Sequence, residues 1–151
     1  MEPSDSADAR AEKIARHMHG AEGTSKACNI SLLEAGEGRA RASMRIRENM
    51  LNGHGIAHGG AIFLLADTAF AWACNSRNVT TFAQQASISF LSKVDAGETI
   101  IAEAREESVT GRTGVYTVRV TAEDGRVVAV FNGLSRTGGG AVIDEKEDEH
   151  E

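Results

Sequence analysis

The spacing of apolar residues along the chain changes twice, and each change predicts a different kind of element. Over residues 9–19 apolar side chains recur at helical spacing, as at Ile14 and Met18, which predicts a short helix that ends at the glycines of residues 20–23. Elsewhere apolar and polar residues alternate with a period of two, which predicts two strands before a long apolar segment and three or four after it. These strands are expected over residues 28–35, 39–46, 81–91, 98–107, 115–122 and 127–134.

The long apolar segment covers residues 58–75 and has no broad polar face. This pattern predicts a helix that is buried on most sides. A sheet can bury such a helix by curling around it, so we expect an α+β fold in which a curved antiparallel sheet wraps one long central helix. The edge strands of that sheet would then be available to pair with another chain.

Composition indicates a single globular domain, since the chain has 151 residues and 41% apolar content. No apolar run is long enough to span a bilayer and the polar N-terminus lacks a signal-peptide core, so we expect a cytoplasmic protein with no membrane partner. The two cysteines are too few for a disulfide framework or a zinc site.

The net charge of −6 is concentrated at the C-terminus, where residues 144–151 hold six acids and one lysine. The rest of the chain is nearly neutral and has no basic stripe, which argues against a nucleic-acid partner. We expect residues 1–25 to be an N-terminal extension with the short helix, disordered over residues 1–8. The domain itself is expected over residues 26–138, and an acidic disordered tail over 139–151.

The strongest chemical signal is a single acid, Asp67, inside the apolar helix, preceded by a glycine-rich turn that ends in Gly59 and Gly60. A buried carboxylate is costly unless it is paired or has a function. Desolvation would raise its pKa, and backbone or asparagine donors would lower it again. The glycine turn leaves N–H groups at the start of the helix free to hold an oxygen. Asp67 is therefore a candidate base or nucleophile, although a structural acid satisfied by neighbouring hydroxyl groups would fit the same pattern.

The spacing of Gly59 and Asp67 places them about 12 Å apart along one helix, because eight residues separate them. Groups that act on one carbonyl must lie about 3 Å from it. We therefore expect a complete site to take Gly59 from one subunit and Asp67 from another, and we expect the monomer to be inactive.

Two histidines in the turn, His54 and His58, have the four-residue spacing that metal ligands use on a helix. The glycines around them indicate a turn rather than a helix, so the two side chains are not expected to share a helix face. No third ligand is evident, so we expect no metal. His58 is expected to hold the turn or the oxyanion region. Asn52 precedes a glycine and could either shape the turn or hold the attacking water.

The motif that runs from Asn52-Gly through His58-Gly-Gly to Leu65-Ala-Asp67-Thr-Ala resembles the hotdog-fold acyl-CoA thioesterases. The segments Met50-Leu-Asn-Gly-His54 and Phe70-Ala-Trp-Ala-Cys-Asn75 are similar to the PaaI-type phenylacetyl-CoA thioesterases. The similarity continues through Ile88-Ser-Phe-Leu91, Thr113-Gly-Val-Tyr116 and Val128-Ala-Val-Phe131, so it covers roughly residues 26–138.

The resemblance implies a hotdog fold, homodimers that assemble into homotetramers, active sites at the dimer interface, and thioester hydrolysis without a cofactor. It assigns catalytic roles to Asp67, to Asn52 as the active-site amide and to Gly59 as the oxyanion donor. Substrate-binding roles would fall on His58, Gly60 and Thr68. Some relatives place a serine on the strand after the helix, where this chain has residues 83–85, Ala-Gln-Gln, so another group would have to orient water.

The coenzyme A phosphates would need cationic partners, for which Lys93, Arg112 and Arg136 are candidates. The resulting hypothesis is an acyl-CoA thioesterase that hydrolyses phenylacetyl-CoA, its hydroxylated relatives or medium-chain esters in aromatic-acid degradation. A hotdog module that binds acyl-CoA without cleaving it, and a hotdog hydratase or dehydratase, are the alternatives. His58 and Asp67 are about 13.5 Å apart along a helix, so a hydratase pair would not be preformed within one chain.

Overall fold

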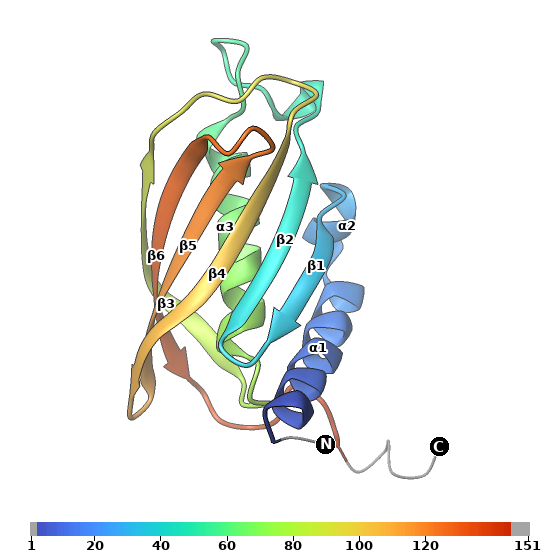
Figure 1. Ribbon diagram of the computed structural model, residues 1–151, viewed down its shortest axis with the longest axis vertical. Helices are drawn as coiled ribbons and strands as arrows, with labels where there is room; N and C mark the ends of the chain where they lie inside the picture. Colours follow the sequence, from blue (N-terminus) through green and yellow to red (C-terminus); the bar gives the residue numbers. More distant parts are fainter. Residues whose placement is uncertain (1–2, 146–151) are drawn as a thin grey trace.

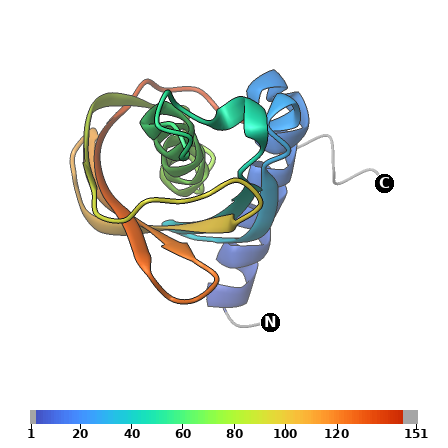
Figure 2. The same cartoon turned by 90° about the horizontal axis from the view of Figure 1, so that it is seen from above.

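In the computed structural model, which describes residues 3–145, six strands form one antiparallel sheet in the order β1-β2-β4-β5-β6-β3. The sheet curves around α3, Gly59–Cys74, which lies along its concave face (Figures 1 and 2). This arrangement confirms the α+β fold with a sheet wrapped around one long helix. The strands are β1 Ser31–Gly36, β2 Arg39–Arg45, β3 Thr81–Phe90, β4 Thr99–Thr110, β5 Thr113–Ala122 and β6 Val127–Thr137. The other helices are α1 Pro3–Ala21, α2 Gly23–Ala27 and the short η1 Glu48–Met50.

The core forms where the apolar face of the sheet meets α3. On β2 the small side chains Ala40 and Ala42 are almost fully buried, and they alternate with arginines on the convex face. On α3 Leu65 and Trp72 have no exposed surface. Small residues on the strand let the sheet approach the helix closely, so both predicted patterns are satisfied by one packing.

One edge of the sheet and one stripe of α3 have no partner among residues 3–145. Strand β3 pairs only with β6, and most of its side chains are exposed. On α3 the stripe formed by residues 60, 64, 67, 68 and 71 is exposed or half-buried. These positions follow helical spacing, so they share one face of the helix.

The N-terminal segment differs from the sequence prediction at its start. Helix α1 begins at Pro3 and is therefore helical over residues 3–8, where disorder was expected. The Asp8 carboxylate accepts hydrogen bonds from the Arg39 guanidinium and the Glu37 N–H, so distant residues hold the start of the helix. Helix α1 ends at Ala21, between the glycines of residues 20–23, as predicted, and a separate short helix, α2, begins at Gly23. Residues 1–2 lie outside the described part of the chain.

Residues 139–145, predicted to belong to a disordered tail, are also placed. The Asn78 side chain accepts the N–H groups of Val142 and Ile143 and donates to the Ile143 carbonyl oxygen. Ile143 is 9% exposed. Residues 146–151, which hold most of the acidic tail, lie outside the described residues. Within the described chain, none of the helices has the length and apolar character to cross a membrane.

Candidate active site

The N-terminus of α3 carries a backbone donor that the protein itself leaves free. His58 is the N-cap, and its Nδ1 accepts the Gly60 N–H at 2.8 Å. The Ala61 and Ile62 N–H groups donate to the His58 carbonyl oxygen. Within residues 3–145 the Gly59 N–H donates to nothing, and it lies at the positive end of the helix dipole. His58 therefore holds the turn, as predicted, and Gly59 presents a donor suited to an oxyanion.

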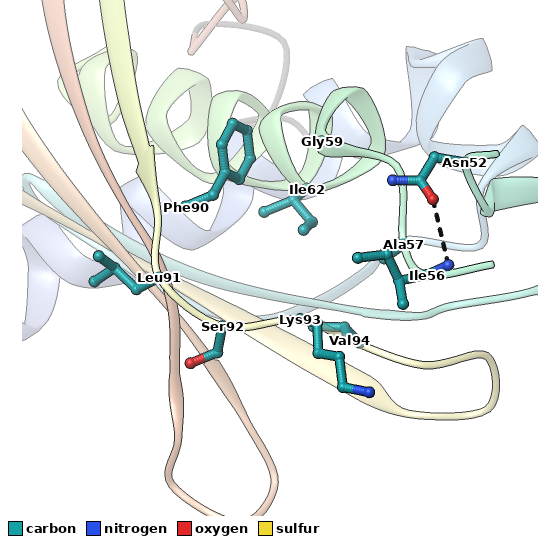
Figure 3. A pocket seen from close by; sticks show the side chains of 10 residues that line it. All are labelled: Asn52, Ile56, Ala57, Gly59, Ile62, Phe90, Leu91, Ser92, Lys93 and Val94. Atoms are coloured by element: carbon teal, nitrogen blue, oxygen red, sulfur yellow. Dashed lines mark hydrogen bonds between the residues drawn. The ribbon is translucent and has the colours of Figure 1, made fainter. Parts of the chain in front are cut away.

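Asn52 shapes the loop before α3 through the oxygen of its side-chain amide. Its Oδ1 accepts the N–H groups of His54 at 2.9 Å and Ile56 at 3.4 Å. The Nδ2 group makes no hydrogen bond in the described chain and lies on the side of the amide away from Ile56 (Figure 3). The turn-shaping alternative is thus confirmed, while the second half of the amide is free for a ligand.

Gly59 and Asn52 line the same cavity of about 390 Å³ (Figure 3). Ile62 and Phe90 supply apolar walls, and Lys93 supplies a positive charge at the rim. The Phe90 ring packs directly on Gly59, where a Cβ would lie 3.0 Å from the ring Cζ. This half of the site therefore combines two free N–H donors with one cation.

Asp67 lies in the middle of α3 and faces a second cavity of about 410 Å³. The walls around its carboxylate are mainly apolar and include Met18, Phe70, Phe82 and Val142. Burial raises the pKa of the Asp67 carboxyl, and the nearby negative charge of Glu22 raises it further. No hydrogen bond or ion pair within residues 3–145 reaches this carboxylate. The backbone and asparagine donors that were expected to lower its pKa again are therefore absent from around Asp67 in the described part of the chain.

Glu22 was not identified from the sequence, because it lies in the turn between α1 and α2, far from the motif. Its carboxylate accepts the Trp72 Nε1–H at 3.0 Å and a short hydrogen bond from the Ser25 hydroxyl. Trp72 is on α3, five residues after Asp67, so the N-terminal helices bring a second acid toward the catalytic candidate. Phe90 and Met18 also went unassigned, since an apolar residue in a strand or helix carries no sign of which cavity it lines.

The remaining predicted residues are divided between the two ends of the molecule. Lys93 lies in the loop after β3, at the Gly59 end of α3. Arg112 is in the turn between β4 and β5 and donates to the Thr137 carbonyl oxygen, and Arg136 lies opposite Phe82 on β6. One chain therefore does not bring the three cations together. The Thr68 hydroxyl donates to the Leu64 carbonyl oxygen within α3.

Of the two glutamines in the position of the relatives' serine, Gln84 donates from its Nε2 to the Ser135 carbonyl oxygen. Within residues 3–145 no group of three or more His, Cys, Asp or Glu side chains is placed to hold a metal ion. The candidate site therefore consists of two half-sites. Gly59, Asn52 and Lys93 line one cavity and Asp67 lines another, about 12 Å along the same helix.

A family model described as the thioesterase superfamily matches residues 54–129. The acyl-coenzyme A thioesterase PaaI of Escherichia coli is 38% identical over 136 residues, which cover 90% of this chain and 97% of that protein. The structure of the E. coli PaaI protein from the phenylacetic acid degradation operon superposes with a TM-score of 0.87 at 37% identity, covering 89% of this chain and 97% of that one. A Streptococcus mutans protein bound to acetyl CoA has a TM-score of 0.72 at 26% identity, covering 75% and 91% of the two chains. The resemblance seen in the motif is thereby confirmed, and the chain belongs to the thioesterase superfamily as a member of its PaaI type.

Proposed function

We propose that the protein hydrolyses phenylacetyl-CoA or its hydroxylated relatives, with medium-chain acyl-CoA as the alternative substrate class, and that it works in aromatic-acid degradation. The coarser activity, hydrolysis of an acyl-CoA thioester, follows from membership of the PaaI type. The observation that carries the proposal is the Asp67 carboxylate, half-buried beside an apolar cavity and without a hydrogen bond in the described chain.

The size and lining of the Asp67 cavity support an aromatic acyl group. The cavity measures about 410 Å³ and has two phenylalanine side chains among its walls. Benzene fits an apolar cavity of about 150 Å³, so a phenylacetyl group has ample room here. The E. coli relative named for the phenylacetic acid operon supports the same class of substrate.

The two half-sites support a catalytic unit made from two copies of the chain. The unpaired edge of β3 and the exposed stripe of α3 would be covered by a second copy related by a twofold axis. In that arrangement the two α3 helices run antiparallel, and Gly59 of one copy lies across from Asp67 of the other. We expect such dimers to assemble into tetramers.

In this dimer the thioester carbonyl oxygen accepts the Gly59 N–H, and the Asn52 Nδ2 group lies on the same side of the cavity. Asp67 of the second copy either removes a proton from the attacking water or attacks the carbonyl carbon itself. In the first case water adds to the carbonyl carbon, the carbon–sulfur bond breaks, coenzyme A leaves as the thiolate, and the free acid is the second product. In the second case loss of the thiolate leaves an anhydride between the acyl group and Asp67, which water hydrolyses to release the acid and restore the carboxylate. His58 and Gly60 hold the turn, Thr68 lies one residue after the acid, and Lys93, Arg112 and Arg136 are the candidates for the coenzyme A phosphates.

The test is thiol release from a panel of acyl-CoA esters by the wild type and by Asp67→Asn. Asp95→Asn serves as the matched control, because Asp95 is an exposed acid outside both half-sites. We expect wild type and control to hydrolyse phenylacetyl-CoA, and Asp67→Asn to lose about 10²-fold or more. Full activity of Asp67→Asn would remove the assigned role of this acid. Binding of acyl-CoA without thiol release by the wild type would favour the non-catalytic module.

A further inference from the structure

The chain after β6 crosses beneath the C-terminal end of α3 toward α1 (Figure 1). We call residues 138–143 the C-terminal strap. Its sequence, Gly-Gly-Gly-Ala-Val-Ile, carries no polar side chain, and Gly139 and Gly140 have φ of 91° and 83°, which favour glycine. The sequence alone gives no sign that such a segment is held in place.

The strap is fixed along its whole length by residues 78–80. The Gly138 N–H donates to the Thr80 carbonyl oxygen at 2.8 Å, and the Thr80 N–H donates to the Gly140 carbonyl oxygen at 2.9 Å. Asn78 then receives the Val142 and Ile143 N–H groups at 3.0 and 2.9 Å and donates back to Ile143. Beyond the strap an ion pair joins Arg10 of α1 to Glu145 at 3.6 Å.

The strap also forms part of the cavity that Asp67 faces. Ala141 and Val142 line this cavity together with Met18 of α1, Phe82 of β3 and Phe70 of α3. The Phe82 ring is packed on the strap's first residue, where a Cβ on Gly138 would lie 3.0 Å from the ring. The strap, which is far from the motif in the sequence, therefore contributes an apolar wall to the cavity, and hydrogen bonds hold that wall in place.

We propose that the C-terminal strap is the wall of the acyl pocket that determines which acyl groups the enzyme hydrolyses, with Val142 as the residue that limits their size and Asn78 as the residue that positions the strap. This proposal rests on the proposed function of Asp67. An acyl chain whose carbonyl carbon lies at Asp67 extends into the cavity that Asp67 and Val142 both line, and there it meets Val142. A wall held in place limits how far an acyl group can extend from Asp67, so the pocket accepts a compact aromatic group and rejects a chain long enough to meet Val142.

The test compares kcat/KM for phenylacetyl-CoA with kcat/KM for acetyl-CoA in each variant, so that losses of active protein cancel. Val142→Phe narrows the pocket and should lower this ratio by about tenfold or more. Val109→Phe is the matched control, because Val109 is 50% exposed near the end of β4 and is not among the residues that line the Asp67 cavity. The control should leave the ratio within about twofold of the wild type.

A second variant, Asn78→Gly, releases the strap without straining the backbone. Asn78 has φ of 63°, which glycine adopts freely, so the variant loses the side-chain hydrogen bonds while it keeps the turn. We expect decanoyl-CoA to gain about tenfold relative to phenylacetyl-CoA. Unchanged ratios in Val142→Phe and Asn78→Gly, with unfolding temperatures showing that both fold, would overturn the role of the strap.

A different result would refute the proposed function itself. If the wild type releases no thiol from any ester, hydrolysis is refuted, and the strap is judged by calorimetric binding of phenylacetyl-CoA and acetyl-CoA. Weaker binding of phenylacetyl-CoA alone to Val142→Phe would then support the strap as a pocket wall. Equal binding of both esters by Val142→Phe and the wild type would refute it.

Discussion

Two variants that damage opposite half-sites should restore each other's activity when their subunits mix. Gly59→Pro removes the free N–H at the start of α3. Proline is favoured at the first position of a helix, and the preceding His58 has the extended backbone, ψ 135°, that a residue before proline requires. Asp67→Asn removes the acid and keeps the shape of its side chain. We expect each variant alone to lose about 10²–10³-fold in kcat, the usual cost of removing an oxyanion donor or a catalytic acid or base.

The expected recovery follows from the distance between the two groups. They lie about 12 Å apart in one chain, so a site that holds both must use two chains. In an equal mixture about half of the dimers contain one subunit of each variant. Each mixed dimer has one site with both groups intact and one with neither, so the mixture should show about a quarter of wild-type activity.

The assay is thiol release from phenylacetyl-CoA after the two variants are refolded together, with each variant refolded alone as the baseline. Gly59→Ala is the control for crowding, because its Cβ meets the Phe90 ring as the proline Cβ would while its N–H remains. It should keep activity within about tenfold of the wild type. If Gly59 and Asp67 of one chain formed a site together, every site in a mixed dimer would be damaged. A mixture no more active than its separate components would therefore refute the shared site.

Three further predictions follow from the surroundings of α3. Glu22→Gln keeps an acceptor for the Trp72 Nε1–H but removes the negative charge that helps to raise the pKa of Asp67. The acidic limb of the pH profile of kcat/KM should therefore move to lower pH, and a limb that stays in place would contradict this coupling. Because the folded state raises the pKa of Asp67, the ionised form costs stability, and this cost appears as the pH rises from about 4 through the raised pKa. Asp67→Asn should therefore raise Tm by a few degrees at pH 7 and change it little at pH 4, as measured by differential scanning calorimetry. Leu65→Ala empties a fully buried position and should cost about 2–5 kcal/mol in urea unfolding, whereas a loss under about 1 kcal/mol would show that α3 repacks.

Local patterns were sufficient to predict α3 and the strands because those patterns are set by the same contacts that form the core. The apolar run ends where α3 ends, and the alternation on β2 matches the burial of Ala40 and Ala42. The two termini were predicted poorly for the opposite reason. Asp8 is fixed by Arg39, and the glycines of the strap are fixed by Asn78, and neither anchor is visible in the sequence around the segment that it holds.

In the candidate site, too, residues within the motif were predicted, whereas the influence of residues far from it in the sequence was not. Asn52, His58 and Gly59 were found because they stand within one short stretch of the sequence, and Asn52 and Gly59 line one cavity. Asp67 was found as an acid in an apolar helix, but its electrostatic surroundings differ from the expectation. Burial and Glu22 both raise its pKa, and the donors expected to offset them belong to the other half-site of the chain.

The raised pKa of Asp67 in the single chain is expected to change when two copies of the chain assemble. If Gly59 and Asn52 of a second copy face Asp67, their N–H groups are the donors that the single chain lacks, and they lower the pKa of the carboxylate when the dimer forms. The ionised, active acid is then favoured only in the assembled protein. Thiol release measured against pH over a dilution series should therefore show the midpoint of the acidic limb moving to higher pH as the dimer dissociates. A midpoint that does not depend on protein concentration would mean that the pKa of Asp67 is set by its own chain alone.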